Sequence, residues 1–365
     1  MRSAAVVDLS AIRDNVGALT SRIGAAQLMA VVKADAYGHG LVPSARAATE
    51  AGATWLGVAF LEEGLALRAA GLTTRVLAWL YTPSEDLVPA VAADLDLAVY
   101  NLAELDRVVA AAEVVGRTAR VQLKVDTGLS RGGAVQAEWA DLVEAAAKAQ
   151  AEGALDVTGI WSHLAFSEEG PEHPVNRAQA AVFAWALEVS AGLEPEVRHL
   201  ANSAAILTDP ASHFDLVRAG AALYGLLPAP SYGDFGLRPA MSLRSEVALT
   251  KRVAAGTGIS YRHRSTTAAE TTLALVPLGY GDGVPRNATN VAPVQIGARR
   301  YTVTGAVAMD QLVVDVGADD VAAGDEVVLF GAGGPTAHEW ATATGTIDYE
   351  IVTRIGGRVP REYVG

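Results

Sequence analysis

The 365-residue chain contains no cysteine. Disulfide bonds, thiolate metal ligands and a thiol nucleophile are therefore excluded, and any covalent catalysis must use another side chain. Hydrophobic residues make up 51% of the sequence. With that apolar content disorder is not expected, and the length predicts two domains at about 150 residues each.

Basic residues are the second deficit, because 28 Lys and Arg stand against 41 Asp and Glu and give a formal charge of −13. This charge argues against nucleic acid or an anionic membrane as the main partner, since both need basic surface. Long apolar runs are missing as well. The first residues lack the apolar segment of about 7 to 15 residues found in signal peptides, and no run approaches the roughly 18 of a transmembrane helix. We expect a soluble, cytoplasmic protein.

From about residue 28 to 220 one pattern repeats: a short apolar run, polar residues, then an Ala/Leu/Glu-rich stretch with helical spacing. We expect strands at 28–34, 55–60, 75–81, 95–100, 120–126, 156–162, 197–201 and 214–219. Helices are expected between them, at 41–52, 62–70, 84–92, 103–115, 136–151 and 175–191. Apolar runs without alternation are typical of parallel strands. Eight such β/α units predict an α/β fold with an N-terminal (β/α)8 TIM-type barrel, with a doubly wound open sheet as the alternative.

The pattern changes after residues 227–240, where three prolines and two glycines indicate a linker. Apolar and polar residues then alternate across 242–253, as in a half-buried strand. Further strands are expected at 272–278, 292–297, 300–308, 311–316 and 326–330, and a helix at 337–344 behind a capping box of Thr336 and Glu339. We therefore expect a barrel domain at 9–230 and a mainly β C-terminal domain at 231–365. The pattern assigns the strand at 4–9 to neither domain.

Polar residues at the ends of the expected barrel strands are the candidates for chemistry, because a barrel collects its active site there. They are Lys33, Lys124, Asp126, His163, Asn202, Ser203 and Arg218. Lys33 is the most informative, because burial lowers the pKa of an amine and makes it a nucleophile or a base. The alternative is that Lys33 forms a buried ion pair with Asp35 or Asp126.

The motif VVKADAYGHG at 31–40 is similar to the signature of the alanine racemase family, whose lysine in this motif carries pyridoxal 5′-phosphate (PLP). Further motifs follow in the order that family uses: LKVDTGLSR (123–131), SHLA (162–165), HLANSA (199–204), VRAGAALYG (217–225), ISY (259–261), GYGDG (279–283), MDQ (309–311) and RVPREY (358–363). The resemblance spans nearly the whole chain. It implies a homodimeric isomerase that interconverts L-alanine and D-alanine, supplying D-alanine as a peptidoglycan precursor.

The resemblance also implies catalytic roles. Racemisation needs two acid/base groups on opposite faces of the α-carbon. Lys33 is implied to hold the cofactor and to serve the D-side proton, and Tyr261 of the partner subunit to serve the L side. His163 and Arg218 are implied to lie behind that tyrosine as a relay, with His199 further out. Arg218 is also implied to face the pyridine nitrogen, where a guanidinium can only donate a hydrogen bond.

Binding roles follow in the same way. The implied cofactor-binding residues are Lys33, Tyr37, His163, Asn202, Ser203, Arg218, Gly220, Ala221 and Tyr349. The implied substrate-binding residues are Arg131, Lys124, Met309 and Asp310, with Arg131 and the Met309 amide on the carboxylate. Lys124 is carbamylated in some members and would then hold Arg131 in place. An ordinary interaction between Lys124 and Asp126 is the alternative.

The chain departs from the family pattern at GAVAMDQ (305–311), where Ala306 replaces an arginine of the access route and Ala308 a cysteine. We expect these changes to alter access rather than reaction type. Three other functions remain open: a racemase of broader specificity that accepts serine or longer side chains, a noncatalytic PLP-binding protein, and an amino acid decarboxylase.

No metal site is expected, because His39, His173, His213 and His263 lack the spacing of metal ligands and are interpreted as surface or turn residues. His338 and Glu339 lack the second histidine of a His-Glu-x-x-His zinc motif, and the capping box of Thr336 and Glu339 explains this segment instead.

Overall fold

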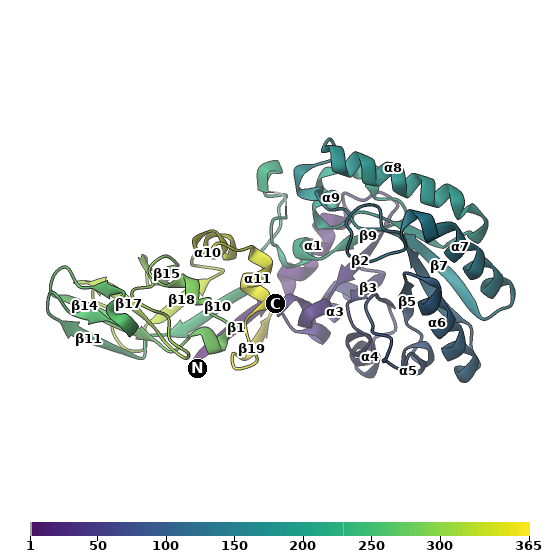
Figure 1. The fold of residues 1–365 in the computed structure, drawn as a ribbon. Helices are drawn as coiled ribbons and strands as arrows, with labels where there is room; N and C mark the ends of the chain where they lie inside the picture. The colour runs from purple at the N-terminus through teal and green to yellow at the C-terminus, as the bar shows by residue number, and fades with distance from the viewer. Residues whose placement is uncertain (1, 229) are drawn as a thin grey trace.

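The computed structural model describes residues 2–228 and 230–365, and it contains two domains joined end to end (Figure 1). One is a ring of parallel strands surrounded by helices, and the other is built mainly of antiparallel strands. Both chain termini lie in or beside the β domain.

The barrel is a sheet of eight parallel strands: β2 (Gln27–Val31), β3 (Trp55–Val58), β4 (Arg75–Ala78), β5 (Asp96–Val99), β6 (Ala119–Lys124), β7 (Leu155–Trp161), β8 (Val197–His199) and β9 (Leu216–Ala219). Neighbours in the sequence are neighbours in the sheet, and β9 pairs with β2. The Asp215 amide donates to the Arg198 carbonyl at 3.1 Å, and the Arg218 amide donates to the Ala201 carbonyl at 3.0 Å. These bonds join β9 to β8 and close the ring, so the barrel prediction is confirmed and the open sheet is excluded.

Helices precede or follow the barrel strands, and most of them cover the outside of the ring (Figure 1). They are α1 (Leu9–Thr20), α2 (Lys33–Tyr37), α3 (Leu41–Glu50), α4 (Leu61–Ala69), α5 (Val88–Ala92), α6 (Leu102–Val115), α7 (Gln136–Ala151), α8 (Pro174–Val189) and α9 (Ser203–Thr208). The short segment α2 lies instead at a cavity. The ring interior contains a separate apolar layer that includes Met29, Trp55 and Trp161.

The C-terminal domain has a six-stranded sheet, a three-stranded sheet and a two-stranded hairpin. The six-stranded sheet has the order β16 (Arg299–Thr302), β15 (Pro293–Ile296), β18 (Glu326–Phe330), β10 (Met241–Glu246), β1 (Ser3–Asp8) and β19 (Arg361–Val364). The three-stranded sheet has β11 (Leu249–Val253), β14 (Thr271–Val276) and β17 (Leu312–Gly317), and the hairpin pairs β12 (Gly258–Ile259) with β13 (Ser265–Thr266). Two helices follow, α10 (Ala337–Thr344) behind its capping box and α11 (Asp348–Thr353).

The N-terminal strand β1, which its pattern leaves unassigned, pairs antiparallel with β10 and parallel with β19. The chain therefore starts in the C-terminal domain, crosses into the barrel through α1 and returns after the linker. Asn15 of α1 binds the linker on both sides, donating to the Arg238 carbonyl at 2.8 Å and accepting from the Arg238 amide at 2.7 Å. The chain therefore passes between the two domains twice, once from β1 to α1 and once through the linker to β10. These two connections restrict how the domains can move relative to each other.

Several predicted strands end a few residues earlier than expected, such as 28–34, which ends at Val31, and 75–81, which ends at Ala78. Two others differ more. The run 242–253 is two strands in different sheets, and Leu249, expected inside, is 46% exposed. The alternation of apolar and polar residues continues without a break through Val247 and Ala248, where the chain passes from one sheet to the other. The pattern therefore does not reveal the change of sheet. The run 300–308 ends as a strand at Thr302, because the following residues form the loop that carries Ala306 and Met309.

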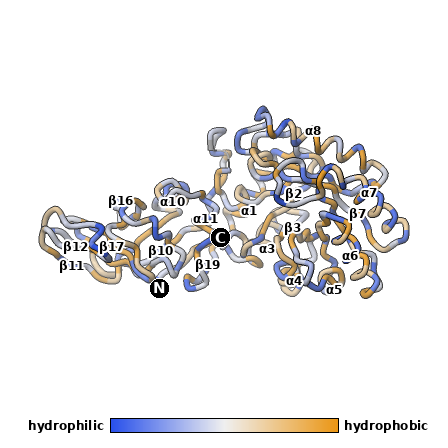
Figure 2. The backbone as a smooth tube through the Cα atoms, viewed as in Figure 1, coloured by the Kyte–Doolittle hydropathy of each residue, from blue (hydrophilic) through white to orange (hydrophobic). Residues whose placement is uncertain are grey.

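Apolar and polar residues are interspersed along the tube in both domains (Figure 2). In the described ranges 2–228 and 230–365, no helix is both long enough and apolar enough to cross a membrane.

Candidate active site

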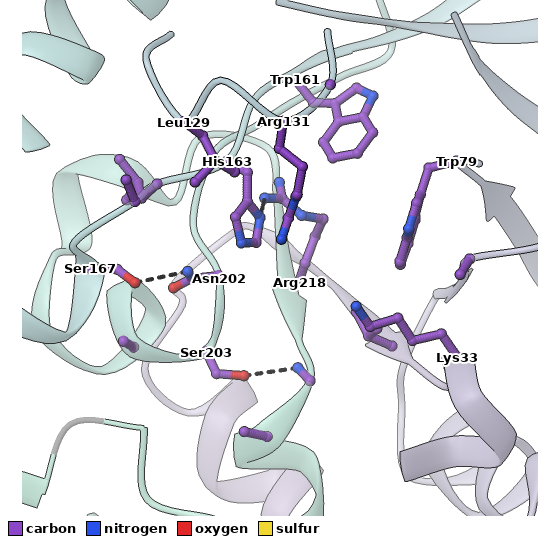
Figure 3. A pocket seen from close by; sticks show the side chains of 18 of the residues that line it. Lys33, Trp79, Leu129, Arg131, Trp161, His163, Ser167, Asn202, Ser203 and Arg218 are labelled. Atoms are coloured by element: carbon purple, nitrogen blue, oxygen red, sulfur yellow. Dashed lines mark hydrogen bonds between the residues drawn. The ribbon is translucent and has the colours of Figure 1, made fainter. Parts of the chain in front are cut away.

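A cavity of about 630 Å³ opens at the C-terminal ends of the barrel strands. Figure 3 shows Lys33 and Trp79 on one side of it, and Arg131, His163 and Arg218 on the other. Eleven of the predicted site residues line this cavity: Lys33, Tyr37, Lys124, Arg131, His163, Asn202, Ser203, Arg218, Gly220, Ala221 and Tyr349. The barrel therefore brings together ten residues that are up to about 190 positions apart in the sequence, as expected for a barrel site. Tyr349 is added to the same cavity by α11 of the C-terminal domain.

Lys33 lies two residues after the end of β2, and its ammonium lies 5.8 Å from the centre of the Trp79 ring. Burial, together with the nearby Arg131 cation, lowers the pKa of Lys33. The alternative of a buried ion pair is not supported: the Asp35 carboxylate accepts from the Leu41 amide at 2.7 Å, and the Asp126 carboxylate accepts from two backbone amides of its own loop. The Lys33 amine is thus left facing the cavity.

The backbone after Lys33 makes a left-handed turn. Ala34, Asp35, Ala36 and Tyr37 have φ between 53° and 55°, a region that disfavours residues with a Cβ. Such strain costs on the order of 1 kcal/mol or more per residue and persists only where surrounding contacts enforce it. The turn is what directs the Lys33 amine and the Tyr37 ring into the same cavity.

Glu63 and Arg361 hold this turn, and neither was predicted as a site residue. Glu63 accepts from the Ala34 amide at 2.6 Å while capping α4 through the Ala59 and Phe60 amides. Arg361 on β19 donates to the Gly38 carbonyl at 2.9 Å. The capping role of Glu63 could have been predicted from its place in the first turn of a helix. The contact of Arg361 with Gly38 could not, because no sequence feature near Arg361 indicates it.

His39 is fully buried, and His213 is buried as well. The prediction that these histidines lie on the surface is therefore wrong, although His39 does lie at a turn. The His39 Nδ1 lies 2.9 Å from the Ala36 carbonyl, and the ring stacks on Tyr224 with centres 4.4 Å apart. A carbonyl can only accept, so Nδ1 carries a proton. Burial lowers the pKa of His39 to about 4.

This burial predicts an acid-sensitive turn. A histidine with an unfolded pKa near 6.5 and a folded pKa near 4 stabilises the fold fully above pH 6.5, and the contribution is lost as pH falls toward 4. The loss amounts to about 3 kcal/mol. Urea unfolding at a fixed protein concentration should show a stability advantage of wild type over His39→Asn that shrinks between pH 7 and pH 4.5. A constant difference over that range would contradict the assignment.

Arg218 links two histidines at the floor of the cavity. Its guanidinium donates to the Nδ1 atoms of His199 and His163, both at 3.0 Å, and to the Ser162 and Leu200 carbonyls. Burial and the Arg218 cation lower the pKa of both histidines well below the usual value. Burial lowers the pKa of Arg218 to about 9, which leaves it a cation at neutral pH. The expected relay residues therefore form one hydrogen-bonded chain.

Lys124 is directed toward two rings instead of toward Asp126. Its ammonium lies 4.8 Å from the centre of Trp161 and 5.2 Å from that of Tyr100. Burial and the Arg218 and Arg131 cations lower the pKa of Lys124 to about 8. Neither Lys124 nor Arg131 forms an ion pair within the described part of the chain, so the cavity carries unneutralised positive charge at one end.

Hydroxyl donors gather at the other end, around Ser203. The Ser203 Oγ accepts from the Gly220 amide at 2.8 Å and from the Ala222 amide at 3.3 Å, which leaves its own proton free to donate into the cavity. A Cβ at Gly220 would lie 2.4 Å from the Tyr37 hydroxyl, so glycine is required for that close approach. The Tyr37 and Tyr349 rings are 6.1 Å apart.

Burial raises the pKa of Tyr37 to about 12 and raises that of Tyr349, so both phenols stay protonated donors. Asn202 is engaged locally instead, capping α9 through the Ala205 amide and donating to Ser167 at 2.8 Å. The donor set fits a phosphate group, with a nucleophilic amine and an arginine within the same cavity to hold the rest of a PLP molecule.

Three predicted residues, Tyr261, Met309 and Asp310, do not line this cavity. They lie on the C-terminal domain and are exposed, Tyr261 by 69% and Met309 by 56%. The Met309 loop is fixed in place, since its carbonyl accepts from the Gly281 amide at 2.7 Å. Ala306 and Ala308 of the same loop are buried.

Acidic and histidine side chains do not cluster for metal binding: over residues 2–228 and 230–365 the structure has no group of three or more that could hold an ion.

Comparison with known proteins decides the family. The alanine racemase N-terminal domain matches residues 7–228, and the alanine racemase C-terminal domain matches residues 240–363. The chain belongs to the alanine racemase family. Among curated relatives, the alanine racemase of Frankia casuarinae is 59% identical over 100% of this chain and 97% of its own length. That of Salinispora tropica is 56% identical over 98% and 97%.

Solved structures of the family agree. Alanine racemase from a D-cycloserine-producing Streptomyces lavendulae superposes with a TM-score of 0.98 at 54% identity, covering 100% of this chain and 97% of that one. Alanine racemase from Bartonella henselae with covalently bound pyridoxal phosphate gives 0.90 at 28% identity, with full coverage of both chains. The two-domain architecture is therefore that of the alanine racemases.

Proposed function

We propose that this chain is a PLP-dependent alanine racemase that works as a homodimer with shared active sites. The observation that carries the proposal is the Lys33 amine, held by a strained turn in a cavity that also contains phosphate donors and Arg218. Relatives named alanine racemase, which are 54% to 59% identical to this chain over nearly its full length, support the same reaction. D-Alanine made in the cytoplasm for peptidoglycan synthesis would be the biological product.

The cavity residues would hold the cofactor at three points. Lys33 would bind it covalently through the amine, Ser203, Tyr37 and Tyr349 would bind the phosphate, and Arg218 would donate to the pyridine nitrogen. When bound, PLP delocalises the negative charge left on the α-carbon when a proton is removed. Because Arg218 stays protonated, it would donate a hydrogen bond to the ring nitrogen without transferring a proton.

Once the amine of the substrate has displaced Lys33 from the cofactor, the freed Lys33 amine would act as the acid/base group on the D side. Its lowered pKa places a larger fraction of the amine in the neutral, proton-accepting form than an exposed lysine would have. Arg131 and Lys124 supply positive charge for the substrate carboxylate, and carbamylation of Lys124 would turn that residue into an anionic partner for Arg131. The lowered pKa of Lys124 favours the neutral amine that carbamylation needs.

Tyr261 of the partner subunit would act on the L side. In one chain, Tyr261, Met309 and Asp310 are exposed on the C-terminal domain and do not line the chain's own cavity. A homodimer in which each C-terminal domain reaches the other barrel would bring them to the substrate. His163, whose Nδ1 accepts from Arg218, would present its Nε2–H toward the partner's Tyr261.

A chiral assay of purified enzyme with PLP over a panel of L-amino acids tests the proposal. We expect L-alanine to be converted to a mixture of both enantiomers, with serine and longer side chains converted poorly. Broad conversion would support the broader racemase instead, amine release a decarboxylase, and PLP binding without turnover a noncatalytic protein.

A further inference from the structure

The hydrogen-bond chain that starts at Arg218 continues through His199 to Gln122. The Oε1 atom of Gln122, on β6, lies 2.7 Å from the His199 Nε2 atom. Both residues are fully buried, and the His199 ring stacks on Trp161 at an interplanar angle of 4°. Gln122 does not line the cavity, so it touches neither substrate nor cofactor there.

Only one proton arrangement satisfies this chain. The Arg218 guanidinium can only donate, so the His199 Nδ1 must accept and carries no proton. The single proton of the neutral ring is then on Nε2 and must meet an acceptor, which is the Gln122 carbonyl oxygen. The flipped amide would place a donor there, and an imidazole cannot accept at both nitrogens unless it is an anion.

We propose that Gln122 is a positioning residue that keeps the His199 proton on Nε2, so that His199 accepts from Arg218 and holds the guanidinium toward the cavity. The effect on catalysis rests on the function proposed above for Arg218, whereas the proton arrangement itself does not.

Two further observations support a role for the amide. The Gln122 Nε2 is buried and has no hydrogen-bond partner among the described residues, an unfavourable state that an apolar side chain of similar size would avoid. The sequence therefore keeps a polar group here although only its carbonyl end is used. Gly159 on the neighbouring strand makes room for it, because a Cβ there would lie 2.8 Å from the Gln122 amide carbon.

The charges around His199 keep it neutral. Arg218 on β9 is the cation that faces it, His163 is reached through Arg218, and Lys124 contacts the Trp161 ring on which His199 stacks. A neutral acceptor at position 122 adds no charge to favour the imidazolium. A carboxylate at the same position would favour it, and the new proton on Nδ1 would face the Arg218 donor.

Gln122→Glu tests the proposal because a carboxylate at this position should favour the protonated form of His199. We expect 15N NMR of histidine-labelled enzyme, with His199 assigned from a His199→Gln spectrum, to show the ring neutral from pH 5.5 to 8.5 in wild type and titrating in the variant. The pH profile of kcat/KM and of cofactor absorbance should gain an acid-side step in Gln122→Glu, with activity lost as pH falls. Gln122→Met, which keeps the volume without the acceptor, should lower kcat/KM roughly tenfold without adding a step.

Thr158→Val is the matched control, because Thr158 is equally buried on β7 and donates to Asp96 at 2.6 Å instead of to the relay. It should lower thermal stability and leave the pH profile unchanged. A wild-type His199 protonated on Nδ1, or a Gln122→Glu enzyme whose His199 and pH profile match wild type, would overturn the proposal. The NMR result is decisive even if the enzyme has no racemase activity, so failure of the proposed function is recognised separately.

Discussion

Replacing Lys33 with alanine is expected to lower alanine racemisation in both directions by at least roughly 10²- to 10⁴-fold, the usual contribution of a positioned acid/base group. The loss should be accompanied by release of PLP on gel filtration, because the covalent link is gone. Chiral chromatography and the visible absorbance of the desalted protein measure the two effects. The physical reason is that the left-handed turn after β2 brings this amine, and the Tyr37 ring, into the cavity.

Two controls accompany this prediction. Lys33→Arg keeps the positive charge without a nucleophilic amine and should be as inactive as Lys33→Ala. Lys148→Ala removes an exposed lysine near the end of α7 and should match wild type. Retention of covalently bound PLP by Lys33→Ala would show that another amine carries the cofactor, and Lys124, in the same cavity, would be the first to examine.

Replacing Tyr261 with phenylalanine is expected to lower racemisation in both directions by roughly 10²- to 10⁴-fold while leaving one half-reaction intact. In D2O, the variant should still exchange the α-hydrogen of D-alanine, because Lys33 remains, and should exchange that of L-alanine far more slowly. The hydroxyl is exposed in the single chain, so its removal should leave the melting temperature within about 2 °C.

This asymmetry separates a two-base mechanism from the alternatives. NMR of the recovered alanine measures exchange, and chiral chromatography measures racemisation on the same samples. Equal exchange of both enantiomers by Tyr261→Phe, or unchanged racemisation, would contradict the assignment of the L-side proton to Tyr261.

The barrel could be predicted from the sequence because each strand and helix carries its own local signal. The helix at 136–151 and the capped helix at 337–344 are predicted with the observed bounds. What local pattern does not contain is the partner of a segment. The alternation across 242–253 is the same whether the chain stays in one sheet or passes between two, and β1 is equally apolar in either domain.

The site was predicted as far as motifs extend. Lys33, His163 and Arg218 follow from strand ends and family resemblance, and the structure places them around one cavity. Glu63, Arg361 and Gln122 were missed because each acts through contacts with residues distant in the sequence. The roles of these polar groups can be inferred only when their burial and their hydrogen-bond partners are known.

Mixing the two inactive variants tests the central claim of shared active sites most directly. Lys33→Ala and Tyr261→Phe subunits, dissociated and reassociated in equal amounts, should form mixed dimers in which one of the two sites has both an intact Lys33 and an intact Tyr261. Because half of the dimers are then mixed, activity should recover to about a quarter of wild type. Mixed dimers that form, as shown by differently tagged subunits, but stay inactive would contradict a site built from two chains.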